Sequence, residues 1–321
     1  MFATLLGPLP RPPLEDDASP DALLEAAVRA QEAAGLEPIT DGGLHGGVGH
    51  LDAWLSTARL TTRAVKQVVT GPYTLGRSSS GSGSGSGSGL GSGSGSRSGA
   101  VGERADATMA HAATLNTVLR ELAAAGCPLI EVREPAATAI GTDPAERALF
   151  REAHLRLLDG VSGSHLSLAV TGGNADTAGI ETILAAPYAS LAVDLVAGPD
   201  NWHLVVATPG DRGIVCGAMP TEAGTADGPE TLLWAVGYAA STAGRGRQRV
   251  GLATASSLAH LPWAVAVRKL ERLGEAARLA DLPAAERIQA LDPRAVSSRR
   301  AALGWVEPRP THRADRDQDP T

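Results

Sequence analysis

Short apolar runs alternate along the chain with longer Ala- and Leu-rich segments, and this alternation restricts the fold more than any other feature. The runs with strand character are 3–7, 37–40, 65–71, 129–134, 166–171, 191–196, 213–219 and 249–254. The segments with helical character are 21–34, 48–60, 104–125, 144–158, 175–184, 229–243 and 261–279. Apolar strands separated by helices indicate a parallel sheet that is covered on its outer face. Eight such strands predict an α/β protein with a single (β/α)8 TIM barrel. The alternative, an open doubly wound sheet, lacks the Gly-rich turn expected after its first strand.

One tract interrupts this pattern directly after the third predicted strand. Residues 77–99 are almost entirely Gly and Ser, so they bury too little apolar surface to offset the entropy of ordering. We therefore expect a disordered, low-complexity insertion there, and a last helical cover at 284–303. The polar segment 307–321 is expected to be a disordered tail. The predicted organisation is a barrel domain over 1–306 followed by that tail.

Composition limits the classes of partner. The net charge of −7 over 321 residues argues against a general nucleic-acid surface, which is basic. No apolar run approaches the length of a membrane span, and the amino-terminal segment lacks the basic start and cleavage site of a signal peptide. Two cysteines do not make a disulfide framework. We expect a cytoplasmic protein that binds a small molecule, without nucleic-acid or membrane partners; no oligomeric state is predicted.

In a barrel of this kind, reactive side chains lie at the carboxyl ends of the strands. Glu134 ends the fourth predicted strand beside a rigid proline, so we expect its carboxylate to face the barrel mouth. Asp194 lies within an apolar strand, where a carboxylate is either paired or protonated. These two carboxylates are the predicted catalytic groups. The predicted substrate-binding residues at other strand ends are Arg11, Asp41, Tyr73, Thr74, Arg133 and Asn174.

Several of these residues have a structural alternative. Asp41 is also a preferred turn and capping residue. Arg133 either pairs with Glu134 or binds a substrate carboxylate through its planar guanidinium. His45 and His50 lie in a Gly-rich loop, where a solvated or capping role competes with ligand or acid–base work. Cys216 fits a small core residue as well as a reactive one.

The sequence contains no strong metal-binding motif. It has no Cys-x-x-Cys, no His-Glu-x-x-His and no His-x-Cys, and it also lacks a Gly-x-Ser-x-Gly nucleophile elbow. The prediction is therefore no metal ligand and no cofactor, with zinc only if unusual ligands hold it.

Four strand-end motifs together resemble one enzyme family. Residues 4–11 read Thr-Leu-Leu-Gly-Pro-Leu-Pro-Arg, residues 39–42 read Ile-Thr-Asp-Gly, and residues 69–74 read Val-Thr-Gly-Pro-Tyr-Thr. Residues 125–136 read Ala-Gly-Cys-Pro-Leu-Ile-Glu-Val-Arg-Glu-Pro-Ala. In this order they are similar to the catalytic barrel domain of cobalamin-independent methionine synthases, over roughly residues 3 to 280. The resemblance implies the same (β/α)8 barrel and a methyltransferase activity of methionine biosynthesis.

The resemblance also implies a zinc site that this sequence does not reproduce. Family members hold zinc through a His-x-Cys on the fifth strand, an acidic residue on the sixth and a Cys on the eighth. The metal makes homocysteine a thiolate that accepts a methyl group. Here residues 168–174 contain neither His nor Cys, and 250–256 contain no Cys; only Asp194 remains. The family's substrate-binding Glu after the second strand is Gly43, and the Asp before its Glu-Pro pair is Arg133.

Three functions follow from these observations. The first is a divergent methyltransferase relative that acts, without the usual zinc, on a small anionic substrate of amino-acid or thiol-like chemistry. The second is a non-catalytic barrel that binds a metabolite or a protein. The third is a true methionine synthase whose zinc is held by atypical ligands such as His45, His50 and Cys216.

Overall fold

The computed structural model describes residues 1–45, 49–81, 95–224 and 228–291. The chain divides into two compact units, Met1–Ala280 and Asp281–Thr321. All strands among the described residues belong to the first unit. In the second, the structure describes helix α10 (Ala284–Leu291). The predicted barrel boundary at 306, the predicted tail and the end of the predicted cover 284–303 lie outside the described residues.

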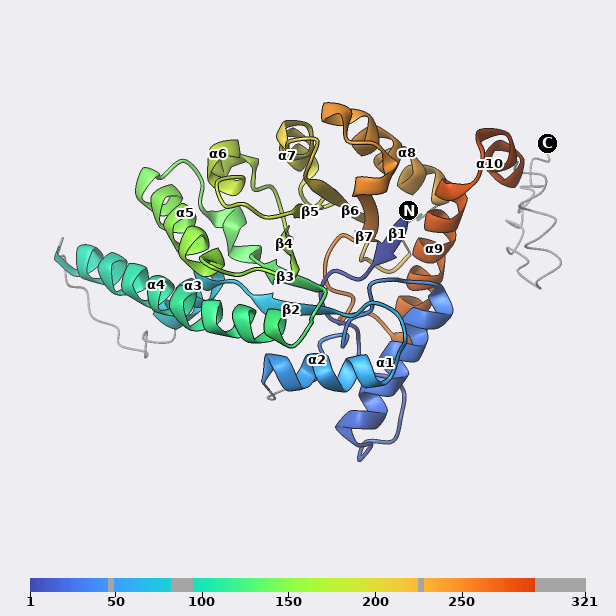
Figure 1. Cartoon of the computed structure of the whole chain (residues 1–321), viewed down its shortest axis with the longest axis horizontal. Helices are drawn as coiled ribbons and strands as arrows, with labels where there is room; N and C mark the ends of the chain where they lie inside the picture. Colours follow the sequence, from blue (N-terminus) through green and yellow to red (C-terminus); the bar gives the residue numbers. More distant parts are fainter. Residues whose placement is uncertain (46–48, 82–94, 225–227, 292–321) are drawn as a thin grey trace, which may run out of the picture. The chain divides into compact units, whose positions relative to one another are not determined.

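Within its described residues, the first unit is built on seven parallel strands. Figure 1 shows how they lie side by side. They are β1 (Phe2–Thr4), β2 (Lys66–Thr70), β3 (Leu129–Arg133), β4 (His165–Val170), β5 (Ser190–Asp194), β6 (Gly213–Met219) and β7 (Val250–Thr254). Their order is β1-β7-β6-β5-β4-β3-β2, and every hydrogen-bonded pair is parallel. The predicted α/β barrel fold is confirmed, with each of these strands inside or within one residue of a predicted run.

The second predicted strand, 37–40, is the exception. It forms two isolated bridges instead of a strand: Ala3 with Glu37, antiparallel, and Ile39 with Val65, parallel. The Glu37 amide donates to the Ala3 carbonyl at 2.8 Å, and the Lys66 amide donates to the Ile39 carbonyl at 2.9 Å. Pro38 has no amide hydrogen and cannot extend a ladder. The segment thus lies between β1 and β2 and contacts both without being a regular strand.

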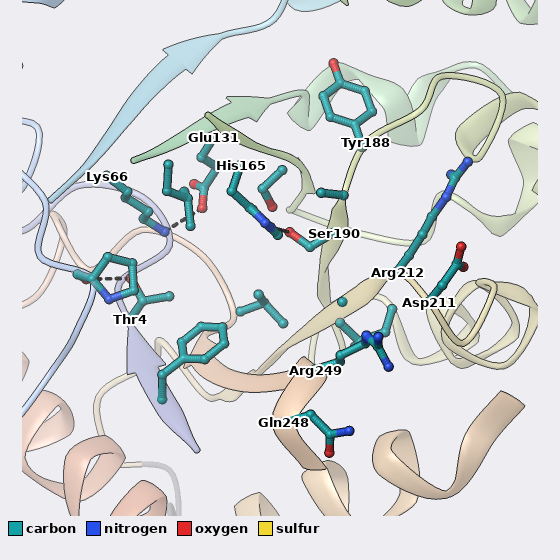
Figure 2. Close-up of a pocket in the computed structure, with 18 of the residues that line it drawn as sticks. Thr4, Lys66, Glu131, His165, Tyr188, Ser190, Asp211, Arg212, Gln248 and Arg249 are labelled. Atoms are coloured by element: carbon teal, nitrogen blue, oxygen red, sulfur yellow. Dashed lines mark hydrogen bonds and ion pairs between the residues drawn. The ribbon is translucent and has the colours of Figure 1, made fainter. Parts of the chain in front are cut away.

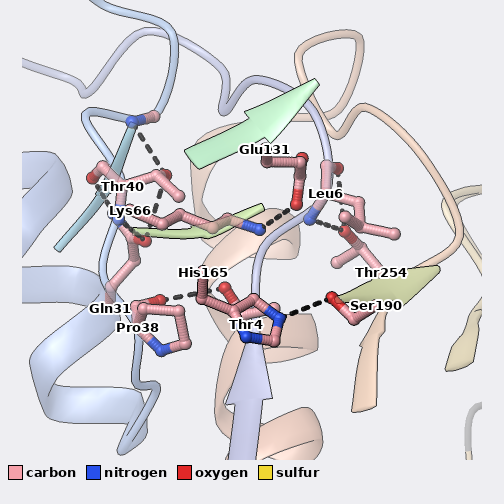
Figure 3. Close-up of polar contacts among 11 residues, drawn as sticks. Thr4, Leu6, Gln31, Pro38, Thr40, Lys66, Glu131, His165, Ser190 and Thr254 are labelled. Carbon is pink, nitrogen blue, oxygen red and sulfur yellow. Dashed lines mark hydrogen bonds and ion pairs between the residues drawn. The ribbon is translucent and has the colours of Figure 1, made fainter. Parts of the chain in front are cut away.

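A buried glutamine holds this segment in place. The side-chain amide of Gln31 donates to the Thr40 carbonyl at 2.8 Å and accepts from the Thr40 amide at 3.0 Å (Figure 3). Gln31 therefore satisfies the two backbone groups that a neighbouring strand would otherwise pair. It lies on α1, so the first helix fixes the position of the degenerate strand.

Helices follow the strands and pack on the outside of the sheet (Figure 1). They are α1 (Pro20–Ala34), α2 (His50–Arg59), α3 (Pro72–Gly81), α4 (Gly95–Ala124), α5 (Pro144–Leu158), α6 (Ile180–Ile183), α7 (Trp202–Ala207), α8 (Pro229–Ser241) and α9 (Trp263–Asp281). Helices α3 and α7 were not predicted. The predicted helix 175–184 is interrupted by Gly179, whose φ of 90° is outside the helical region. The Gly/Ser tract lies between α3 and α4. Helix α3 continues into the tract as far as Gly81, and α4 begins within it at Gly95; residues 82–94 lie outside the described ranges.

Two apolar clusters stabilise the barrel unit. The larger one lies between the sheet and the helices. The smaller one fills the barrel interior with the inward side chains of Leu6, Ala169, Ala192, Val215 and Ala253. These side chains come from β4 to β7 and from the segment just after β1, so they form one layer across the interior, between the two ends of the strands. Within the described ranges, no helix is long and apolar enough to span a membrane.

Candidate functional site

The direction of each side chain on β3 decides what faces the barrel mouth. Arg133 is paired in register with Ala169, whose side chain belongs to the interior cluster, so Arg133 also points inward. Successive side chains on a strand point to opposite faces. Glu134, the next residue, therefore points outward, toward the helices. The expected orientation of Glu134 toward the mouth is corrected by this alternation, and Arg133 takes that place.

The Glu134 carboxylate is fully buried at the amino terminus of α3. Its Oε1 accepts the Tyr73 amide at 2.9 Å, and its Oε2 accepts the Thr74 amide at 2.8 Å and the Thr74 hydroxyl at 2.5 Å. The first amides of a helix have no partner inside the helix, and a carboxylate there is favoured by the helix dipole. Glu134 therefore caps α3 from the neighbouring strand. Gly71 makes room for it, because a Cβ there would lie 2.2 Å from Oε1.

Behind Glu134, a line of buried polar groups runs between the sheet and α5. His154 Nε2 lies 3.2 Å from Glu134 Oε1, and His154 Nδ1 is hydrogen-bonded to the Tyr188 hydroxyl at 2.6 Å. Burial, with the Glu134 carboxylate nearby, raises the pKa of Tyr188 well above its ordinary value. Sequence reasoning missed His154 and Tyr188, because neither follows a strand and a buried His inside a helix gives no motif.

Tyr73 and Thr74 take part in the same packing. The Tyr73 ring is buried against Phe150 with centroids 5.5 Å apart, and its hydroxyl donates to Glu146 at 2.5 Å. Burial raises the pKa of Tyr73. Arg104 also forms an ion pair with Glu146. Tyr73 therefore lies in the core between α3 and α5, and Thr74 is occupied with Glu134; the predicted substrate contacts of both remain a prediction.

Asp194 does lie inside the mouth, but its oxygens are engaged. Oδ1 accepts the amides of Val196 and Ala197 at 2.9 and 2.8 Å, and Oδ2 accepts the amide of Gly172 at 3.0 Å. These bonds join the end of β5 to the end of β4. The carboxylate thus satisfies buried backbone donors, which is the paired state expected of a buried acid.

Arg133 contrasts with both carboxylates. Its side chain is half-buried at the carboxyl end of β3, and it forms no hydrogen bond or ion pair with any residue that the structure describes. A guanidinium presents five donors in a planar fork suited to carboxylate or phosphate. Among the predicted site residues, Arg133 is the one whose charged group faces the barrel mouth and has no protein partner among the described residues.

The remaining predicted residues lie in surface loops. The Arg11 guanidinium donates to the carbonyls of Glu15 and Asp16 at 3.0 and 3.1 Å. Asp41 accepts the amide of Gly43 at 2.9 Å, which is the turn role left open by the sequence. The Asn174 side chain donates from Nδ2 to the Asp200 carboxylate at 2.8 Å, and its Oδ1 accepts the Asp200 amide at 2.9 Å. Arg11 and Asp41 each hold their own loop, whereas Asn174 joins the loop after β4 to the loop after β5. A role in substrate binding stays a prediction for all three.

The atypical zinc ligands are not brought together. The Cys216 thiol points outward under α8, 3.9 Å from the Ala235 carbonyl, and burial raises its pKa to about 12. His50 lies beside Gln67 on β2 at 3.4 Å, and burial lowers its pKa. No group of three His, Cys, Asp or Glu side chains suited to a metal occurs within residues 1–45, 49–81, 95–224 and 228–291. The residues present therefore do not fit the zinc site that the resemblance implies.

Comparison with known proteins identifies the same family as the motifs. No family model matches the chain. Two curated relatives, the 5-methyltetrahydropteroyltriglutamate–homocysteine methyltransferases of Rhodopseudomonas palustris strains TIE-1 and CGA009, are each 29% identical over 210 residues. Each match covers 60% of this chain but 26% of the relative, so the chain matches about a quarter of those proteins. The predicted resemblance to cobalamin-independent methionine synthases is confirmed.

Solved structures show the shared fold. A B12-independent methionine synthase from Shewanella sp. W3-18-1, in complex with selenomethionine, has a TM-score of 0.65 at 14% identity. That comparison covers 90% of this chain and 99% of the other. A methyltransferase from Methanosarcina mazei has a TM-score of 0.56 at 13% identity, covering 86% and 93% of the two chains. At sequence identities of 13–14%, these structures show that the fold is shared and nothing more.

Proposed function

We propose that this chain is a methyltransferase-like barrel that binds a small anionic substrate, of amino-acid or thiol-like chemistry, at the carboxyl ends of its strands and without the usual zinc. The observation that carries the proposal is Arg133, a half-buried, inward guanidinium with no partner among the described residues. A charge held partly out of water without a counter-ion is unfavourable. An anionic ligand would supply the missing partner through charge-assisted hydrogen bonds.

The zinc-free part of the proposal is supported by the ligand set. A thiol becomes a thiolate at neutral pH when a cation or a base lowers its pKa. Of the acidic and sulfur ligands expected at the strand ends, the sequence retains Asp194, and its oxygens accept three backbone amides. A zinc ion there would need two or three further ligands, which the described residues do not gather. The proposed substrate is therefore held by Arg133, with no step assigned to a metal.

Calorimetric titration with L-homocysteine, L-methionine and the product analogue S-methylcysteine, with and without zinc, tests the binding step. We expect saturable binding that does not depend on zinc and that falls by about 10-fold or more in Arg133→Met, since a charge-assisted bidentate pair is lost. Arg156→Gln, an exposed change on α5, is the matched control. Binding by Arg133→Met that equals the parent would contradict the role of Arg133. Stoichiometric zinc in the purified protein would instead favour a true methionine synthase with atypical ligands.

A second function, binding without catalysis, is favoured by one specific observation. Every carboxylate oxygen of Glu134 and Asp194 accepts a backbone hydrogen bond, so neither acid has an oxygen committed only to a ligand. Transfer of a methyl group from 5-methyltetrahydropteroyltriglutamate to homocysteine, followed as methionine formed, separates the two functions. Turnover that is lost in Arg133→Met supports the enzyme; ligand binding without any turnover supports the binding protein.

A further inference from the structure

A cavity of about 590 Å³ opens at the amino-terminal end of the barrel, away from the end where the substrate is proposed to bind. Residues at the starts of the strands line it, among them Phe2, Lys66, Leu129, His165 and Ser190. Figure 2 labels Lys66, His165 and Ser190 among them. Its volume lies within the range of small-molecule sites. In barrels of this class the amino-terminal end is normally a packed, stabilising face. An open cavity there therefore needs its own explanation.

The inner part of the cavity holds a buried ion pair. Lys66 Nζ lies 2.5 Å from Glu131 Oε2, with side chains that are 1% and 3% exposed (Figures 2 and 3). The other carboxylate oxygen, Glu131 Oε1, is buried without a hydrogen-bond partner among the described residues. A buried carboxylate oxygen without a donor costs free energy that a ligand N–H would recover. The cavity therefore offers an acceptor at its inner end.

Polar groups continue along the wall. His165 Nε2 is hydrogen-bonded to the Ser190 hydroxyl at 2.8 Å, and burial lowers the pKa of His165. A lowered pKa favours the neutral imidazole. Phe2 supplies an apolar surface. Its ring packs against Gly251, where a Cβ atom would lie only 2.3 Å from the ring carbons. The wall is thus partly polar and partly apolar.

The outer part is cationic. Arg249 is exposed and has no hydrogen bond or ion pair within the described ranges. The Nη1 group of Arg212 donates hydrogen bonds to the carbonyls of Leu184 and Ala186, at 3.0 and 3.3 Å. Figure 2 shows Arg249 across the cavity from the Lys66–Glu131 pair, whereas the Arg212 guanidinium points away from that pair. Asp211 also lines the cavity. The exposed guanidinium of Arg249 is the group in this outer part that can pair with an anion.

We propose that this cavity is a second ligand site, which binds a small organic anion carrying an amine at its far end. The anionic group pairs with Arg249, the amine donates to Glu131 Oε1, and the apolar chain between them lies along Phe2. This site is separate from the one around Arg133, and its existence does not depend on the methyltransferase proposal.

Three probes of matched length test the site by calorimetry on the full chain: 6-aminohexanoate, hexanoate and hexylamine. We expect saturable binding of 6-aminohexanoate that is at least about 10-fold tighter than that of either single-ended probe, because both ends are then paired. Arg249→Gln should remove most of this gain, while Arg156→Gln on the outside of α5 should not. Absence of saturable 6-aminohexanoate binding, or equal binding of the three probes, overturns the proposal.

The ion pair is tested with a double variant, since Glu131→Leu alone would leave a buried unpaired lysine and risk unfolding. Lys66→Met/Glu131→Leu replaces both charges with apolar groups of similar size, which is often neutral for stability. In this variant, once its folding is verified by circular dichroism, 6-aminohexanoate should bind no more tightly than hexanoate. Undiminished preference for the amine would contradict the assignment of Glu131. The Arg133→Met variant should bind 6-aminohexanoate as the parent does, so a failure here is distinguishable from a failure of the proposed function.

Discussion

At the scale of single residues, the last residue of β3 and the residue that follows it point to opposite faces of the sheet and have different roles. Glu134 points outward and caps α3, whereas Arg133 points inward without a protein partner in the described ranges. Glu134→Gln keeps one carbonyl oxygen but replaces the other by an NH₂ group, so one helix amide loses its acceptor. We expect the free energy of unfolding to fall by about 1–3 kcal/mol, the cost of an unsatisfied buried donor. Urea denaturation measures it.

Glu152→Gln is the matched control for that measurement. It is an exposed change on α5 and should stay within about 0.5 kcal/mol of the parent. Equal stabilities for Glu134→Gln and the control would mean that the cap contributes nothing.

The two buried cysteines should make the free energy of unfolding fall as the pH rises above about 9. Burial raises the pKa of Cys216 from 9.0 to about 12 and that of Cys127 from 9.0 to about 11. Above pH 9 the unfolded thiol loses its proton while the native thiol keeps it, so the unfolded chain binds fewer protons and stability falls as pH rises toward the native pKa. Each thiol should contribute a slope of about −1.4 kcal/mol per pH unit.

The variant Cys216→Ala isolates this contribution. Urea titrations at pH 8, 9 and 10 should show stability falling less steeply in Cys216→Ala than in the parent, since the other titrating groups are common to both. Parallel curves at all three pH values would show that the native thiol ionises as readily as the unfolded one.

At the scale of elements, a buried glycine at the start of a helix and an exposed glycine inside a helix should respond oppositely to alanine. A Cβ at Gly71 would lie 2.2 Å from the Glu134 carboxylate, while one at Gly237, exposed on α8, would meet nothing within 4 Å. Gly71→Ala should be destabilising by about 1–3 kcal/mol, because it displaces the cap of α3. Gly237→Ala should be stabilising by about 0.5–1 kcal/mol, because alanine restricts the unfolded chain and favours a helix. Thermal and urea unfolding of the two variants checks both signs, and a shared sign would contradict this account.

The degenerate second strand should depend on Gln31. Gln31→Leu leaves the amide and carbonyl of Thr40 buried without partners, so we expect a loss of about 1–3 kcal/mol for each group left unsatisfied. Hydrogen exchange should accelerate at Thr40 more than at Ile130 in β3. Glu25→Gln, exposed on the same helix, is the control. Unchanged protection at Thr40 would show that the bridges alone hold the segment.

Periodicity in the sequence predicted most of these elements, and the exceptions have physical causes. The strands β2 to β7 lie in short segments rich in Val, Leu, Ile and Ala, so their positions followed from the local sequence pattern. Segment 37–40 also looks like a strand, but Pro38 removes a ladder donor and a side chain on α1 replaces the ladder. Helix α3 was missed because its first turn reads as a turn sequence and its cap, Glu134, is 60 residues away from Thr74 in the chain. No local pattern contains that contact.

For the whole molecule, the barrel has two ends with different chemistry, separated by an apolar layer. The strand-end rule predicted the region around Arg133 and Asp194, and the structure places both there. It did not predict the cavity at the other end, because the residues that line it are spread from Phe2 to Arg249 and only the folded sheet brings them together. The orientation of Glu134 was missed for a different reason: it requires the strand register, which the sequence does not supply.

That separation predicts that changes at the two ends act independently. Arg133→Met removes a half-buried charge without a partner among the described residues, so it should leave the ligand-free protein as stable as the parent or more stable by about 0.5–1 kcal/mol, as expected when a residue serves binding at the expense of stability. Combined with Lys66→Met/Glu131→Leu, the effects on the unfolding free energy should add within about 0.5 kcal/mol, since the groups share no partner. Urea denaturation of the four proteins in this cycle measures the coupling. A larger coupling would mean that the layer formed by Leu6, Ala169, Ala192, Val215 and Ala253 transmits strain between the ends, and binding at one end would then alter binding at the other.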